Sequence, residues 1–150
     1  MKANNHPENE CVLIDISDRK QYLKVLEKLR KLTHKIIIVQ IDGPIKNDPI
    51  VNTAYSLLHL EKKEIVNKWF GTIAEGDRGA VKYTFNTIRN RREFFGFLSS
   101  LDSFWDGIET ISDKYDFNAR FDDIAFLDEQ ERLLFYSTTH ENIFCIRKEL

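Results

Sequence analysis

The chain is poor in the residues that cross-link, break or anchor a polypeptide. Its 150 residues include only two cysteines, three prolines and six glycines. The two cysteines, Cys11 and Cys145, lack the spacing of a zinc site, so we expect two buried thiols. No apolar run approaches the roughly 18 residues of a membrane-spanning helix. Residues 1–10 are polar and lack the apolar core of a signal peptide, so we expect a disordered lead-in, no membrane association and a cytoplasmic protein.

The chain also lacks the short motifs of the common enzyme classes. It has no Gly-x-Ser-x-Gly elbow, no Walker phosphate loop and no Cys-His pairing of recognisable spacing. His140 and Glu141 form a His-Glu pair that could carry protons, but the second histidine of the His-Glu-x-x-His zinc motif is missing. The sequence therefore favours a protein without enzymatic activity, metal or cofactor. A small enzyme using His140 and Glu141 is the alternative.

What is present is the composition of a globular protein. A chain of this length can bury enough surface to fold as one domain, which we place at residues 11–150. Capping signals and apolar periodicity predict an α+β fold with a mostly antiparallel sheet and two principal helices, at about 18–33 and 90–112. Strands are expected at 11–16, 35–42, 50–60, 64–73, 80–86, 120–127, 133–139 and 143–147, with 61–63 as a hairpin turn.

Charge is divided unevenly along the chain. Residues 78–92 carry five basic residues and no acidic one, whereas residues 102–131 carry ten acidic residues and two basic ones. The second stretch thus has a net charge of −8. Because the whole chain is only −2, the rest of it carries +6. Such a separation of charge steers partners of opposite charge.

The acidic stretch opens with four carboxylates at helical spacing. Asp102, Asp106, Glu109 and Asp113 fall within roughly 60° of one another on a helix. They form a solvated helix face, an anionic surface for a cationic partner or, less favoured because the carboxylates do not converge, a site for a hard cation such as Mg²⁺. Asp122 and Asp123 either extend that surface or mark the end of a strand. Trp105 lies at its border, either as a core anchor or as an interface hot spot.

A local resemblance bears on this choice. The segment Leu101-Asp102-Ser103-Phe104-Trp105-Asp106 is similar to the Leu-Asp-x-Leu-Trp-Asp segment of the barstar family of ribonuclease inhibitors. Upstream, Phe94-Phe95-Gly96 resembles the Tyr-Tyr-Gly of that family. In barstar-like proteins this segment plugs a ribonuclease active site. The resemblance implies that Asp102, Trp105 and Asp106 contact a partner here, and that Phe94 and Phe95 take the tyrosine positions.

These observations favour a non-enzymatic protein-binding module, most concretely an immunity-type inhibitor of a cationic bacterial toxin. Its expected contact residues are Asp102, Trp105, Asp106, Glu109, Asp113, Asp122 and Asp123. A further alternative is nucleic-acid binding through Arg89, Arg91 and Arg92. That alternative is disfavoured because the adjoining acidic stretch repels a polyanion. The same arginines could instead bind a second copy of the chain in a homodimer.

Overall fold

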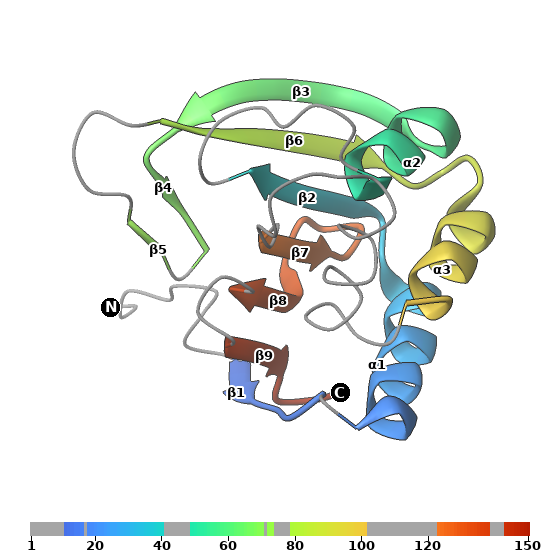
Figure 1. Ribbon diagram of the computed structural model, residues 1–150. Helices are drawn as coiled ribbons and strands as arrows, with labels where there is room; N and C mark the ends of the chain where they lie inside the picture. Colours follow the sequence, from blue (N-terminus) through green and yellow to red (C-terminus); the bar gives the residue numbers. More distant parts are fainter. Residues whose placement is uncertain are drawn as a thin grey trace.

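A seven-stranded antiparallel sheet organises the protein. The computed structural model describes residues 11–16, 18–40, 49–70, 72–73, 79–101, 123–138 and 143–150. Within this part of the chain, three helices gather along one side of the sheet (Figure 1). The strand order is β1-β9-β8-β7-β2-β6-β3, and every neighbouring pair is antiparallel. The strands are β1 (Cys11–Leu13), β2 (Lys35–Gln40), β3 (His59–Val66), β6 (Ala80–Asn86), β7 (Asp123–Leu127), β8 (Leu133–Thr138) and β9 (Ile143–Arg147).

Strand β2 lies in the middle of the sheet and is buried on both faces. Ile36 and Ile38 join the main core, whereas Ile37 and Val39 join a second cluster on the opposite face. Alternate side chains of a strand point to opposite faces, so a continuous apolar run suits a strand that is covered twice. The prediction of a central strand here is confirmed. A separate hairpin, β4 (Lys68–Trp69) and β5 (Thr72–Ile73), brings Trp69 into the second cluster.

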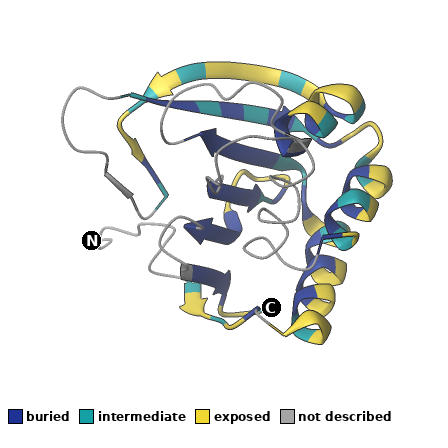
Figure 2. Cartoon of the chain, in the orientation of Figure 1, coloured by how far each residue is buried: buried dark blue, intermediate teal, exposed yellow. Residues whose placement is uncertain are grey.

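The three helices are α1 (Arg19–Leu32), α2 (Pro49–Leu57) and α3 (Arg91–Ser99). Figure 2 shows their buried residues facing the sheet and their exposed residues facing outward. In α1, the buried side chains are Tyr22, Val25, Leu26 and Leu29, spaced as an amphipathic helix requires. The structure is therefore a single α+β domain with a helical layer on one face of an antiparallel sheet. None of the described helices has the length and apolar character needed to cross a membrane.

Two sequence predictions in the middle of the chain are wrong. The expected strand at 50–60 is mostly helix α2, whose buried positions Ile50, Val51 and Ala54, together with Leu58 just after the helix, follow helical spacing. The expected turn at 61–63 lies inside β3, whose only partner among the described strands is β6. β3 is an edge strand, and exposed Lys and Glu side chains are a common way to protect such an edge.

The ends of the helices also differ from the prediction. Asp18 and Asn90 precede α1 and α3, but neither side chain makes the expected capping bond. Asn90 instead has a left-handed backbone, with φ of 58°, and its Nδ2 donates to Leu57 O at 2.9 Å. Helix α3 confirms the start of the predicted helix at 90–112, but it ends at Ser99, before the acidic stretch begins. Residues 102–112 of that prediction lie outside the described residues.

The last three strands confirm the prediction for the end of the chain. β9 matches the expected strand at 143–147, and β7 and β8 lie within the strands expected at 120–127 and 133–139. The acidic residues after β7 form the turn that leads into β8. Asp128 is nearly buried there, Glu129 is exposed, and Glu131 forms an ion pair with Lys35 at 3.3 Å.

Candidate functional site

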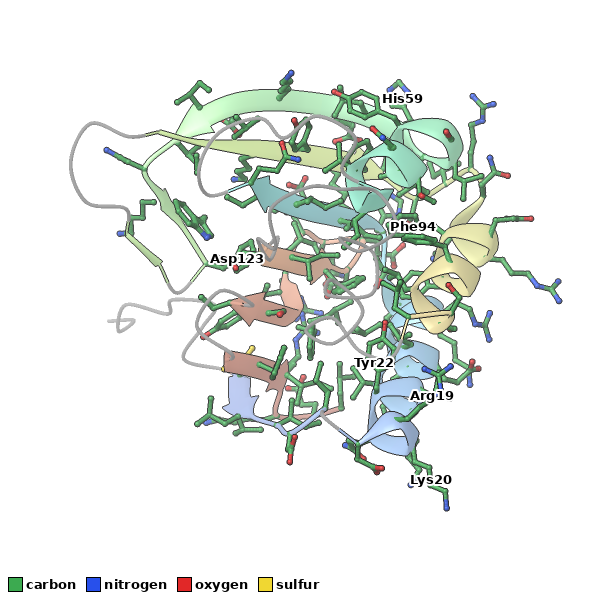
Figure 3. The ribbon with its side chains drawn as sticks, in the orientation of Figure 1. Arg19, Lys20, Tyr22, His59, Phe94 and Asp123 are labelled. Carbon is green, nitrogen blue, oxygen red and sulfur yellow. The ribbon has the colours of Figure 1, made fainter. Side chains whose placement is uncertain are left out.

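Most of the predicted partner-contacting residues fall outside the described residues. These are Asp102, Trp105, Asp106, Glu109, Asp113 and Asp122. Asp123 is described, and its side chain is fully buried at the start of β7 (Figure 3). Its Oδ2 accepts a hydrogen bond of 2.8 Å from Trp69 Nε1. Asp123 therefore ties the β4–β5 hairpin to the sheet and is not part of an exposed contact surface.

The position from which the acidic stretch starts is firmly anchored. Arg19, the first residue of α1, donates from Nη1 to Leu101 O at 2.6 Å and from Nη2 to Ser99 O at 2.7 Å. One turn further along α1, the Tyr22 hydroxyl donates to Leu98 O. These bonds satisfy carbonyls at the C-terminal end of α3, which helices otherwise leave unpaired. Leu101 and Asp123, the described residues on either side of 102–122, are therefore both held by side-chain hydrogen bonds.

Phe94 and Phe95, the counterparts of the tyrosines in the resemblance, belong to the interior. Phe94 is fully buried and Phe95 is 2% exposed, and both pack in the main core. The ring centroid of Phe95 lies 5.7 Å from that of Phe126 on the sheet. Their main role in the described structure is to hold α3 against the sheet.

The helical layer carries a strongly basic surface. Helix α1 contains six basic residues and one acid, Glu27. Glu27 pairs within the helix, 2.7 Å from Arg30 and 3.8 Å from Lys31. The hydrogen bond from Arg30 lowers the pKa of Glu27. The other exposed cations of α1 are Arg19, Lys20, Lys24 and Lys28.

The three arginines near α3 do not form one site. Arg89 and Arg92 are exposed, whereas Arg91 is partly buried and donates from Nη1 to Thr33 O at 2.6 Å. Arg92 lies beside a groove between α1 and α3, and Arg91 lies beside a second pocket at the end of α1. The structure therefore does not bring Arg89, Arg91 and Arg92 together into one nucleic-acid-binding site. Helix α1, which packs against α3, carries further basic residues.

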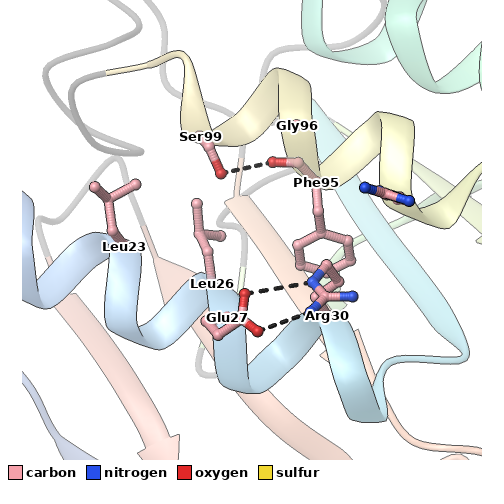
Figure 4. Close-up of a pocket in the computed structure, with 8 residues that line it drawn as sticks. Leu23, Leu26, Glu27, Arg30, Phe95, Gly96 and Ser99 are labelled. Atoms are coloured by element: carbon pink, nitrogen blue, oxygen red, sulfur yellow. Dashed lines mark hydrogen bonds and ion pairs between the residues drawn. The ribbon is translucent and has the colours of Figure 1, made fainter.

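The groove between α1 and α3 has a volume of about 680 Å³ (Figure 4). Leu26 and Phe95, both nearly buried, contribute its apolar part, and the Arg30–Glu27 ion pair lies along α1. Gly96 leaves open space, because a Cβ at this position would meet no atom within 4 Å. The residues that line the groove are Leu23, Leu26, Glu27, Arg30, Arg92, Phe95, Gly96 and Ser99.

The second pocket, of about 450 Å³, lies where the end of α1 meets α3, the β7–β8 turn and β9. Its charged lining consists of four basic residues, Lys31, Arg91, Arg132 and Arg147, and two acidic ones, Asp128 and Glu129. His34, which follows α1, also lines it. The pocket is thus predominantly cationic.

Asp128 organises one wall of this second pocket. Its Oδ1 accepts the backbone N–H groups of Gln130 and Arg132, both at 2.9 Å. Its Oδ2 accepts from Arg132 Nε and from Arg147 Nη2, both at 3.2 Å. Burial alone would raise the pKa of Asp128, but the backbone N–H groups and the Arg147 guanidinium outweigh it and lower the pKa overall. The carboxylate is therefore a charged structural group.

The structure does not test the alternative hypothesis of a small enzyme. His140 and Glu141 lie outside the described residues. Among the described residues, no group of three or more His, Cys, Asp or Glu side chains is arranged to hold a metal ion. Cys145 is buried as expected, whereas Cys11 is partly exposed, contrary to the expectation of two buried thiols.

Comparison with known proteins found no protein family, no curated protein and no solved structure that matches this chain.

Proposed function

We propose that the protein is a non-enzymatic protein-binding module that blocks a cationic partner, in the manner of an immunity-type inhibitor of a toxin. The observation that carries this proposal is the separation of charge. A net −8 stretch, residues 102–131, follows a helical layer whose α1 alone carries six basic residues and one acid. In this proposal Asp102, Asp106 and Glu109 face basic groups of the partner, with Asp113 and Asp122 beside them. Trp105 is the apolar anchor.

The anchoring of the flanking residues supports this proposal. Arg19 holds the carbonyls of Ser99 and Leu101, and the Trp69 indole holds Asp123. Flanking residues that are already held do not have to be ordered when a partner binds nearby, which lowers the entropic cost of association. Asp123 itself is left out of the proposed contact set because it is buried.

The mechanism is steric and electrostatic blockage of the partner's basic site. Complementary charge acts mainly on the association rate and on selectivity, and a central aromatic side chain supplies much of the affinity. As an immunity-type protein, it would act in the cytoplasm of a bacterium that makes the toxin.

The test uses two charge-reversal variants of equal net charge. Asp102→Lys with Asp106→Lys changes the proposed site, whereas Glu93→Lys with Glu149→Lys changes two exposed acids elsewhere. A basic partner is first isolated by affinity capture at low salt, and its association rate is then measured with purified proteins. The proposal predicts a loss of about tenfold or more for the first variant only. A partner that binds both variants equally well contradicts the proposed site.

Nucleic-acid binding is a second candidate function, because α1 and α3 pack against each other and both helices carry basic residues, with Arg30 and Arg92 lining the groove between them. Lys20, Lys24 and Lys28 are exposed on α1, and Arg89 and Arg92 are exposed near α3. A gel-shift assay with single-stranded RNA at two salt concentrations tests this candidate. Salt-sensitive binding that is lost on changing Lys20 and Lys24 to glutamine would favour it over the inhibitor.

A further inference from the structure

The second pocket gathers cations from four separate parts of the fold. Lys31 comes from the last turn of α1, Arg91 from the first residue of α3, Arg132 from the β7–β8 turn and Arg147 from β9. Basic side chains that converge from several elements repel one another unless an anion lies between them. Asp128 and Glu129 also line the pocket and balance part of this charge, so the four cations exceed the two carboxylates by two positive charges.

Both carboxylate oxygens of Asp128 accept hydrogen bonds from the protein itself. Four hydrogen bonds, two from backbone N–H groups and two from the guanidinium groups of Arg132 and Arg147, reach its oxygens. Arg147 is also only 8% exposed and donates from Nε to Leu133 O at 2.9 Å. Asp128 and Arg147 therefore form the rigid, internally balanced base of the pocket.

The remaining cations keep unused donors. Lys31 is 65% exposed, and its nearest carboxylate oxygen, on Glu27, lies 3.8 Å away. The guanidinium group of Arg132 donates to Asp128 from Nε alone, and the guanidinium group of Arg91 donates to Thr33 O from Nη1 alone. Their other N–H groups have no partner within the described residues. The C-terminal end of α1 would normally repel an anion, but the Thr33 carbonyl there already accepts hydrogen bonds from Thr87 Oγ1 and Arg91.

We infer that this pocket binds the phosphate group of a small phosphorylated ligand. Arg91 and Arg132 would supply planar guanidinium donors and Lys31 a third positive charge, the groups that proteins use to bind phosphate. A volume of about 450 Å³ lies in the range of small-molecule sites, so it admits a phosphate together with part of the molecule that carries it. The inference is independent of the proposed function, because residues 102–113 take no part in it.

Inorganic pyrophosphate is the first probe, titrated by calorimetry at low salt and followed by amide NMR. We expect saturable one-site binding, with chemical-shift changes centred on Thr33, His34 and Gln130. The test variant is Lys31→Gln with Arg132→Gln, which leaves the backbone bond from Arg132 to Asp128 intact. Its affinity should fall by about tenfold or more, since two charge-assisted contacts are lost.

The control variant is Lys20→Gln with Lys24→Gln, which removes the same charge from exposed positions on α1 outside the pocket. Its affinity should change by less than about twofold, as expected for distant surface charges that salt screens. Equal losses in both double variants would show unspecific attraction and overturn the inference. Absence of saturable binding would also overturn it.

The source of the phosphate is then distinguished with two larger ligands. A nucleoside triphosphate that binds at least as tightly as pyrophosphate, and loses affinity only in the Lys31→Gln, Arg132→Gln variant, supports a small phosphorylated ligand. A single-stranded oligonucleotide that binds more tightly, and is weakened by the Lys20→Gln, Lys24→Gln variant as well, contradicts it. That result would assign the cations of α1 to a nucleic-acid backbone.

Discussion

Replacing Asp128 by alanine should destabilise the protein by about 3 kcal/mol. Removing one partner of a buried ion pair costs about 3 to 5 kcal/mol, because the other charge is left buried and unpaired. Arg147, at 8% exposure, is that charge here. It keeps its bond to Leu133 O, and the Arg132 side chain is 62% exposed, so we expect the lower end of the range. For a chain of this size, the melting temperature should fall by roughly 6 to 12 °C.

The matched control is Glu129→Ala, one residue further along the same turn. Glu129 is exposed, so its loss should change the free energy of unfolding by less than about 0.5 kcal/mol. Urea unfolding at pH 7, monitored by circular dichroism, measures both variants against the parent protein. An unfolding free energy of Asp128→Ala within about 0.5 kcal/mol of the parent value would be no larger an effect than a surface substitution has. That result would show that the hydrogen-bond network of Asp128 does not stabilise the fold.

The effect of Asp128→Ala should also depend on pH. The pKa of Asp128 in the folded protein lies below its ordinary value of 3.8, so the charged form is stabilised by folding. Its contribution to stability is therefore complete well above pH 3.8 and is lost as the pH falls through the folded-state pKa. The difference in unfolding free energy between the parent and Asp128→Ala should shrink when urea unfolding is repeated at pH 3. A difference that does not change between pH 7 and pH 3 would refute the role of the carboxylate charge.

Three further substitutions probe other parts of the account. Arg19→Gln should lower the free energy of unfolding in urea by about 1 to 2 kcal/mol, because two charge-assisted bonds at the surface are lost. It should also weaken partner binding, since Leu101 is no longer held; an unchanged affinity would contradict this. Thr33→Val should stabilise the protein by about 1 kcal/mol in the same assay, because the buried Thr33 hydroxyl has no hydrogen-bond partner among the described residues. A destabilised Thr33→Val would show that the hydroxyl is satisfied. In Trp69→Phe, Trp105 is the only tryptophan, and its fluorescence should shift to shorter wavelength when the partner binds.

Local patterns in the sequence were sufficient for much of the fold. Helix α1 has apolar residues at helical spacing, and β2 and β9 are short apolar runs rich in isoleucine, so the local pattern agrees with the final structure in all three. Helix α2 shows where such patterns fail. Ile50 to Leu60 is a short apolar segment, and periodicity alone does not separate a short buried helix from a strand.

Contacts between distant residues explain what the sequence did not predict at the candidate sites. Asp123 was expected to extend the acidic surface, but its side chain is buried and its hydrogen-bond partner Trp69 lies 54 residues away. The phosphate pocket draws its cations from α1, α3, the β7–β8 turn and β9, so no local spacing marks it. The basic and acidic stretches, in contrast, are sequence properties, and they carry the proposed function directly.

The most direct test of the proposed function is the association rate of the basic partner with the Asp102→Lys, Asp106→Lys variant. The Glu93→Lys, Glu149→Lys variant has the same net charge and serves as the reference. The account predicts that the first variant associates at least about tenfold more slowly than the reference at low salt, and that the gap narrows at high salt. Equal association rates for the two variants would contradict an acidic binding site at residues 102–106.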